Sequence, residues 1–168
     1  MSELISGKII SAQINEELRN EVEHLKARGV EPCLAVILVG EDPASAVYVR
    51  NKKRTCAELG IRSIGHDLPE TTSQEELENL VHDLNNDTSV HGILNQFPLP
   101  KGLDESRVIR TISPEKDVDG LHPLNAGLIA MGQPSFISCT PYGVLQMLKR
   151  SDISTSGKKV VVLGRSNL

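Results

Sequence analysis

The chain has 168 residues, enough for one well-packed domain or for one domain and the beginning of a second. Its composition, 39% hydrophobic and 24% charged, is ordinary for a globular protein, and its formal net charge of −4 argues against nucleic acid or an anionic membrane surface as the main partner. With two Tyr, two Phe and no Trp, it also has few side chains on which single-stranded nucleic acid can stack.

The same residues predict a cytoplasmic protein without a metal site. The first residues show no basic segment followed by an apolar one, and the longest apolar run, Cys33 to Val39, is far shorter than the roughly 20 residues that span a bilayer. Cys33, Cys56 and Cys139 are widely spaced, which is typical of reduced packing cysteines. The five histidines show no ligand spacing.

The first part of the chain alternates helical and strand patterns. Apolar side chains recur at helical spacing over residues 5–28, and a continuous apolar run at 33–39 is typical of a parallel strand covered on both faces. A helix is predicted over 43–59, because Asp42 can cap it, Pro43 suits its first turn and Gly60 suits its end. A weaker strand at 61–68, a helix after the capping box near Ser73, and a third strand at 90–94 follow.

After the third strand the chain contains shaped loops and short helices. The run NQFPLPKG, from residue 95, holds two prolines and a glycine where a parallel strand hands over to a helix. Helices are predicted over 104–112, 125–131 and from Thr140 onward, whereas the polar stretch 113–123 fits no regular element. A Ser/Thr/Gly/Lys-rich segment at 151–159 indicates a domain boundary before a buried strand at 160–163.

This alternation predicts an α/β fold with a mainly parallel sheet flanked by helices and right-handed crossovers. The domain assignment is a first domain over residues 1–150 and the beginning of a second over 151–168.

One stripe on the 43–59 helix stands out as a candidate site. Tyr48 and Lys52 are four residues apart, so they are offset by about 40° around the axis and roughly 6 Å along it, with Ser45 and Thr55 on the same stripe. The simplest interpretation of Lys52 is an exposed, solvated lysine without a specific function. A functional lysine needs a cleft and a polar partner, and ligands of open parallel sheets bind beyond the carboxyl ends of the strands. Gln96 and the DVDG segment, residues 117–120, are the candidates there.

A glycine turn after the last predicted strand is the second candidate site. Gly164, Arg165 and Ser166 resemble the start of a phosphate-binding turn, in which an arginine favours a 2′-phosphate. A Tyr-x-x-x-Lys pair also occurs in short-chain dehydrogenases. In that family the glycine-rich turn opens the chain, whereas here it follows the pair, which argues against that interpretation.

Five segments in order resemble the bifunctional methylenetetrahydrofolate dehydrogenase/cyclohydrolases, over essentially all 168 residues. They are GEDPASAVYVRNKKRTCAELGI, HGILNQFPLP, PEKDVDGLHPLNAG, SCTPYG and VVVLGRSNL. Three residues depart from the family pattern: Asn95 and Phe97 replace the usual Val and Leu beside Gln96, and Ser138 stands where proline is usual.

The resemblance implies residue roles. Lys52 is the expected general acid/base of the cyclohydrolase step, Tyr48 packs on the folate ring, Gln96 holds the ammonium, and Asp119 holds the amino-pyrimidine end of the pterin. Ser45, Pro98, Asp117 and Thr140 are expected as further substrate or cofactor contacts. Gly164, Arg165 and Ser166 would bind NADP as the first turn of a Rossmann-type domain.

The resemblance also implies a function in one-carbon metabolism and purine biosynthesis. The expected reactions are NADP-dependent oxidation of 5,10-methylenetetrahydrofolate and hydrolysis of the methenyl product to 10-formyltetrahydrofolate, in a homodimer when full length. Because the sequence stops inside the cofactor turn, we expect the 168 residues to be a fragment without dehydrogenase activity of its own. The alternative is a folate-binding module.

Overall fold

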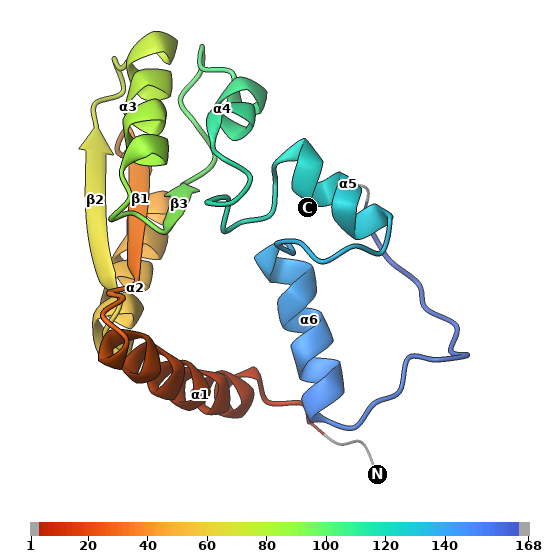
Figure 1. Ribbon diagram of the computed structural model, residues 1–168. Coiled ribbons are helices and arrows are strands. Elements are labelled where there is room, and N and C mark those ends of the chain that lie inside the picture. Colours follow the sequence, from red (N-terminus) through yellow and green to blue (C-terminus); the bar gives the residue numbers. More distant parts are fainter. Residues whose placement is uncertain (1–3, 165–168) are drawn as a thin grey trace.

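The computed structural model describes residues 4–164, which form a three-stranded parallel sheet with helices around it (Figure 1). The strand order is β2-β1-β3. The strands are β1 (Cys33–Val39), β2 (Arg62–Leu68) and β3 (Gly92–Asn95), and the helices are α1 (Gly7–Ala27), α2 (Pro43–Leu59), α3 (Gln74–Asn86), α4 (Glu105–Thr111), α5 (Pro123–Ala130) and α6 (Cys139–Arg150). The predicted α/β fold with a parallel sheet is confirmed.

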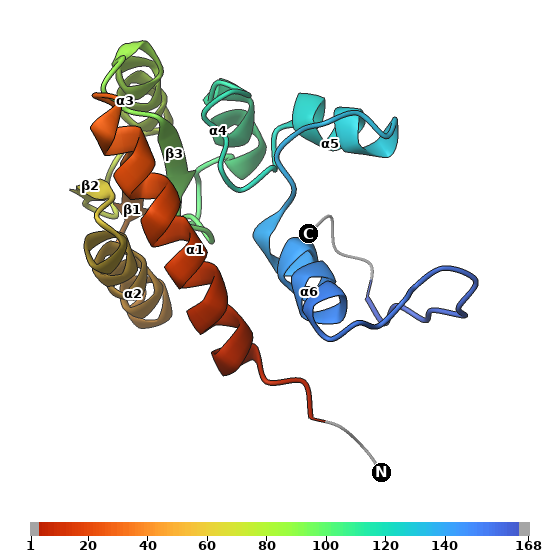
Figure 2. The ribbon, with the colours of Figure 1, turned by 60° about the horizontal axis from the view of Figure 1, so that its bottom comes forward.

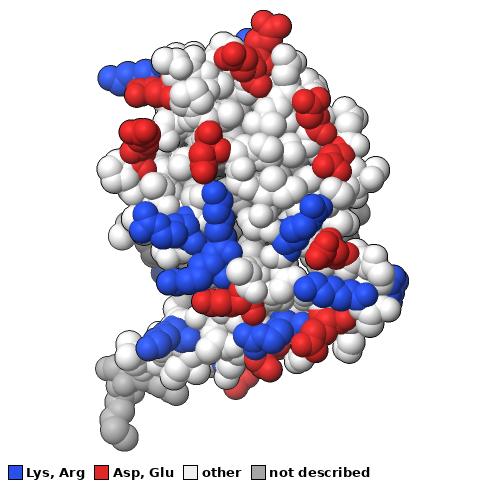
Figure 3. Space-filling view, turned by 90° about the vertical axis from the view of Figure 1, so that its left-hand side faces the viewer, with Lys and Arg blue, Asp and Glu red and all other residues white. Residues whose placement is uncertain are grey.

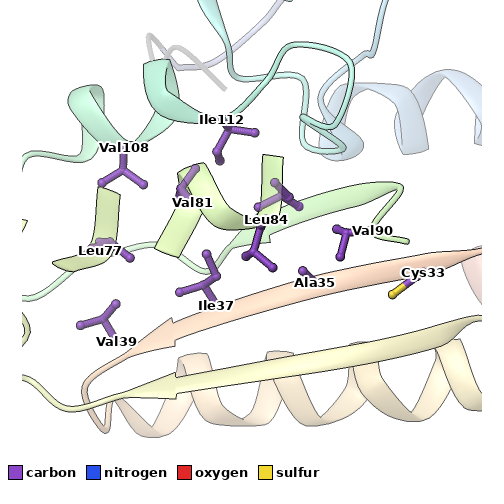
Figure 4. Packing of buried hydrophobic residues seen from close by; sticks show 11 residues of the cluster. Cys33, Ala35, Ile37, Val39, Leu77, Val81, Leu84, Val90, Val108 and Ile112 are labelled. Atoms are coloured by element: carbon purple, nitrogen blue, oxygen red, sulfur yellow. The ribbon is translucent and has the colours of Figure 1, made fainter. Parts of the chain in front are cut away.

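The central strand β1 is covered on both faces, as its unbroken apolar sequence predicted. On one face Ala35 and Ile37 pack with Leu77 and Val81 of α3 and with Val108 of α4 (Figure 4). On the other face Val36 packs with Val49 of α2 and Leu94 of β3. Burial on both sides therefore places α2 opposite α3 and α4.

Helix α2, which carries Tyr48 and Lys52, begins and ends where the sequence predicts. An Asp42 carboxylate oxygen accepts a 2.7 Å hydrogen bond from the Ser45 N–H, and Pro43 lies in the first turn. At the other end Gly60 adopts a φ of +77°, a left-handed conformation that glycine reaches without steric strain. The buried side chains Val49, Cys56 and Leu59 fix which side of the helix faces the core, and hence where Lys52 lies.

Helices α5 and α6 lie apart from the sheet (Figures 1 and 2). Helix α6 has no buried residue and meets the rest of the molecule along α1. There the Arg150 guanidinium donates to both carboxylate oxygens of Glu17, at 2.7 and 2.6 Å. A bidentate pair of this kind orients two elements that share few apolar contacts.

The prediction of a buried strand at 160–163 is wrong for this structure. Val160, Val161, Val162 and Leu163 are 68–94% exposed and form no strand. A strand needs a neighbour to pair with and a surface to cover it, and within residues 4–164 this segment has neither. Arg165 and Ser166, two of the predicted phosphate-turn residues, lie outside the described residues.

Charged side chains of both signs share the face that includes the β2 edge (Figure 3). Lys53 pairs with Asp67 at 3.5 Å, Arg62 with Glu31 at 3.9 Å and Arg54 with Glu58 at 3.7 Å. Exposed pairs such as these contribute little to stability. Among the helices within residues 4–164, none has both the length and the apolar character to cross a bilayer.

Lys116 gives a test of how the 113–123 segment is anchored. Its ammonium donates to the carbonyl oxygens of Leu84, Asn85 and Asp87, at 2.9, 2.8 and 2.8 Å, at the carboxyl end of α3. Because these acceptors lose a charged donor, we expect Lys116→Met to lower the free energy of unfolding by about 2 kcal/mol in urea denaturation.

The matched control for this substitution is Lys101→Met. Lys101 is exposed and makes no hydrogen bond or ion pair to the part of the chain that the structure describes. Its replacement should change the free energy of unfolding by less than about 0.5 kcal/mol. Equal effects of the two substitutions would contradict the anchoring role of Lys116.

Candidate functional site

Lys52 meets Gln96 where α2 passes the carboxyl end of β3. The Lys52 ammonium donates a 3.2 Å hydrogen bond to Gln96 Oε1, the contact that the sequence analysis expected. Gln96 Nε2 in turn donates to the backbone oxygen of Phe97 at 2.7 Å, which orients the amide with its oxygen toward the lysine. The lysine therefore has a neutral acceptor as its partner.

Two cavities meet around this pair. One, of about 360 Å³, is the more polar of the two, and Gln96 and Thr140 are among its lining residues. The other, of about 600 Å³, extends along α2 and is lined mainly by apolar side chains such as Leu34 and Leu94. Both are lined by Tyr48, Lys52, Asp119 and Cys139. The predicted cleft beside Lys52 is thus present, with one polar and one apolar part.

The polar stretch that fitted no regular element is held beside β3 by a buried carboxylate. The Ile93 N–H donates to Lys116 O at 2.7 Å, so the chain before Asp117 lies against the strand. Asp117 is 3% exposed, and its Oδ2 accepts 2.8 Å hydrogen bonds from the His122 N–H and the Asn125 amide. Asp117 therefore shapes the turn that presents Asp119.

Asn125 connects this turn to the segment before α6. Its amide nitrogen also donates to Pro114 O at 2.9 Å, while its oxygen accepts from the Ser135 hydroxyl at 2.8 Å. Gly120 lies so close to the same segment that a β carbon there would come within 2.8 Å of Phe136 O. This packing carries Cys139 and Thr140 to the cavities.

Burial shapes the electrostatics of the site. Removal from water raises the pKa of the Asp119 carboxyl above its ordinary value, and the nearby Lys52 charge opposes that rise. The Cys139 thiol, whose sulfur lies 3.9 Å from Asp119 Oδ1, also has a raised pKa because it is partly shielded from water and lies beside that carboxylate. An acidic group is thus held in a partly dry pocket next to an ammonium.

The predicted site residues divide into two groups. Tyr48, Lys52, Gln96, Asp119 and Thr140 all line the polar cavity. The others lie elsewhere: Ser45 is buried in the first turn of α2, Pro98 is exposed after a cis peptide bond, Asp117 supports the turn, and Gly164 is exposed.

Several residues of the site were not predicted. Cys139 was interpreted as a packing residue, and no role was given to His122 or Asn125. The signal for Asn125 was its place at the start of a predicted helix directly after the irregular polar stretch, where a buried amide can bind loop carbonyls. The three departures from the family pattern, Asn95, Phe97 and Ser138, all line the polar cavity. No group of three His, Cys, Asp or Glu side chains in the described residues is arranged to hold a metal ion.

Comparison with known families accounts for this arrangement. The model for the catalytic domain of tetrahydrofolate dehydrogenase/cyclohydrolase matches residues 5–119, and the model for the NAD(P)-binding domain of the same family matches residues 138–168. The chain belongs to this family. Membership replaces the short-chain dehydrogenase interpretation.

The relatives of the chain in this family are longer than the chain. It is 54% identical to the Bifunctional protein FolD of Agathobacter rectalis, covering 100% of this chain and 60% of that protein. The FolD dehydrogenase/cyclohydrolase of Campylobacter jejuni superposes with a TM-score of 0.97 at 46% identity, covering 98% of this chain and 59% of that one. A Trypanosoma brucei FolD solved with NADP and an inhibitor superposes with a TM-score of 0.93 at 37% identity, and the match covers 98% of this chain and 57% of that one.

Asp119 gives a test of the electrostatics of the site. A carboxyl whose pKa is raised by folding contributes stability at low pH and loses it as the pH rises through the raised pKa. We therefore expect Asp119→Asn to raise the melting temperature of the ligand-free protein at pH 7. The gain should shrink as the pH falls toward the ordinary pKa of aspartate. Calorimetry of both proteins between pH 4 and 8 checks this, and a constant difference would contradict it.

Proposed function

We propose that the protein oxidises 5,10-methylenetetrahydrofolate with NADP and hydrolyses the methenyl product to 10-formyltetrahydrofolate. The observation that carries the proposal is the Lys52–Gln96 pair in the wall of a cavity that Tyr48 and Asp119 also line. Family membership supplies the reaction class. Residues 1–150 would form the folate-binding domain, and residues 151–168 the beginning of the NADP-binding domain.

Lys52 would move protons in the hydrolytic step. Water would add to the cationic methenyl carbon and lose one proton to the lysine amine, which leaves a hydroxyl on that carbon. The hydroxyl then loses its proton as the ring carbon–nitrogen bond breaks, so that a formyl group forms, the departing nitrogen takes up a proton, and one proton is released overall. A base for this step must lose its own proton near neutral pH. Gln96 orients the amine through the hydrogen bond that its side-chain oxygen accepts.

Tyr48 and Asp119 would bind and orient the substrate. The Tyr48 ring is 62% exposed, on the cavity side of α2, where it offers a flat surface to an aromatic ring. Asp119, held by the turn around Asp117, would accept hydrogen bonds from the amino-pyrimidine edge of the pterin. Two such contacts at different points of one ligand fix the position of the methenyl carbon relative to Lys52.

NADP, when bound, would accept the hydride of the first reaction. Gly164 fits a phosphate-binding turn, because it adopts a φ of +146° and, within residues 4–164, no atom lies within 4 Å of the place where a β carbon would be. Its backbone is therefore open to close approach by a phosphate. Gly164, Arg165 and Ser166 would hold the cofactor, and Thr140 would contact it at the polar cavity.

The whole protein would be a cytoplasmic homodimer that supplies one-carbon units for purine biosynthesis, with neither nucleic acid nor membrane as partner. The other function we consider is a folate-binding module without dehydrogenase activity. Both functions need the folate site, and they differ in NADP-dependent turnover.

Substitution of the lysine tests the hydrolytic role. We expect Lys52→Met to lower the rate of methenyltetrahydrofolate hydrolysis by at least about 100-fold, because the acid/base group is lost while the apolar stem remains. The hydrolysis is followed by the loss of the methenyl absorbance, with dehydrogenase activity measured in parallel.

The control is the neighbouring residue, Lys53→Met. Lys53 points to β2, where it pairs with Asp67, and does not line either cavity around Lys52. Its replacement should leave hydrolysis within about twofold. If Lys52→Met hydrolyses the substrate as fast as the control variant, Lys52 is not the acid/base group.

Alkylation of Cys139 tests folate binding without any turnover. Cys139 is exposed at the cavities, whereas Cys33 and Cys56 are buried. With 5-formyltetrahydrofolate, a stable reduced folate, at ten times its dissociation constant, about a tenth of the sites stay free. Iodoacetamide should then label Cys139 about tenfold more slowly, as read by mass spectrometry. An unchanged rate on Cys139 would place the folate elsewhere.

A further inference from the structure

Asn95 is a buried polar residue whose hydrogen-bonding groups are unused. It is the last residue of β3, directly before Gln96, and it is 2% exposed. Neither its amide nitrogen nor its amide oxygen has a hydrogen-bond partner within residues 4–164. Asp117 and Asn125 are almost as deeply buried, but their side chains are hydrogen-bonded to each other.

An unpaired amide at this position lowers the stability of the fold. A buried polar atom without a partner is destabilising because it has lost its hydrogen bonds to water, and Asn95 has two such atoms. Asn95 lies on the same side of β3 as Ile93, which is packed in the larger apolar cluster. A valine, usual in the family at this place, would fit these surroundings better. Residues that lower the stability of the fold in this way are typical of functional sites.

The position of Asn95 connects it to the cavity of the lysine. It lines the polar cavity together with Lys52, Gln96 and Asp119. Phe97 and Leu121 line this cavity and also a neighbouring one of about 370 Å³. The amide atoms of Asn95 are covered in the free protein, so pairing with a ligand in the cavity requires a shift of the surrounding side chains.

We propose that Asn95 is a substrate-contacting residue whose amide is unpaired in the free protein and pairs with the bound folate. A carboxamide donates and accepts, so it suits a neutral ring edge that carries both a carbonyl and an N–H, such as that of the pterin. The contact adds to the charged one expected from Asp119. This inference rests on the proposed function, because it needs folate in the cavity.

The experiment compares Asn95→Val with Asn95→Thr. The two new side chains have nearly the same shape, but only threonine keeps a hydrogen-bonding group, so the pair separates polarity from packing. The dissociation constant of 5-formyltetrahydrofolate is measured by calorimetric titration. We expect Asn95→Val to bind about tenfold more weakly than the natural protein, with Asn95→Thr in between. The ligand-free Asn95→Val protein should melt at a higher temperature.

Ser63→Ala is the matched control. Ser63 Oγ is also buried without a partner in the described residues, but it lies on β2 and lines neither cavity around Lys52. Its removal should leave the dissociation constant unchanged. Binding by Asn95→Val as tight as that of the natural protein overturns the inference, and so does equal weakening of the Val and Thr variants, which would indicate shape alone. Absence of folate binding by the natural protein overturns the proposed function and this inference together.

Discussion

The burial of β1 on both faces is the constraint from which the rest of the structure follows. Ile37 and Val36 point to opposite sides of one strand, so α3 and α4 must cover one face and α2 the other. Because Val49 packs against this second face, the rotation of α2 is set, and Lys52 lies at the end of β3, where Gln96 follows. The candidate site is thus a consequence of packing two layers of helices on one apolar strand.

A second constraint acts in the segment between α4 and α6, which is mostly irregular apart from the short helix α5. Residues 114–138 contain few apolar anchors, and buried hydrogen bonds of Asp117 and Asn125 shape them instead. Such networks hold a loop in one conformation only when their members are paired. The contrast with Asn95 is informative, since its amide lies near this network and remains outside it. One set of polar groups stabilises the site, and the other is available to a ligand.

Much of the fold was predictable because its signals are local. Helix ends depend on residues such as Asp42, Ser73 and Gly60, and the contact of each cap with its own backbone needs no tertiary information. The 160–163 segment shows the limit. Its apolar pattern is that of a buried strand, yet a strand forms only with a partner, and the described chain offers none. A pattern of apolar residues predicts that a segment can form a buried strand. Whether the strand forms depends on a neighbouring strand and on a surface that covers it.

The sequence by itself determined the order of the elements, the stripe of Tyr48 and Lys52 on one helix, and the family to which the chain belongs. Only the tertiary structure decided which polar residues meet. It separated Asp117, which is buried in the turn, from Asp119, which lines the cavity, although only one residue lies between them in the sequence. It also brought Cys139 to the lysine and left the Asn95 amide unpaired. The reason is that hydrogen bonding and burial depend on neighbours distant in the chain, which no local pattern specifies.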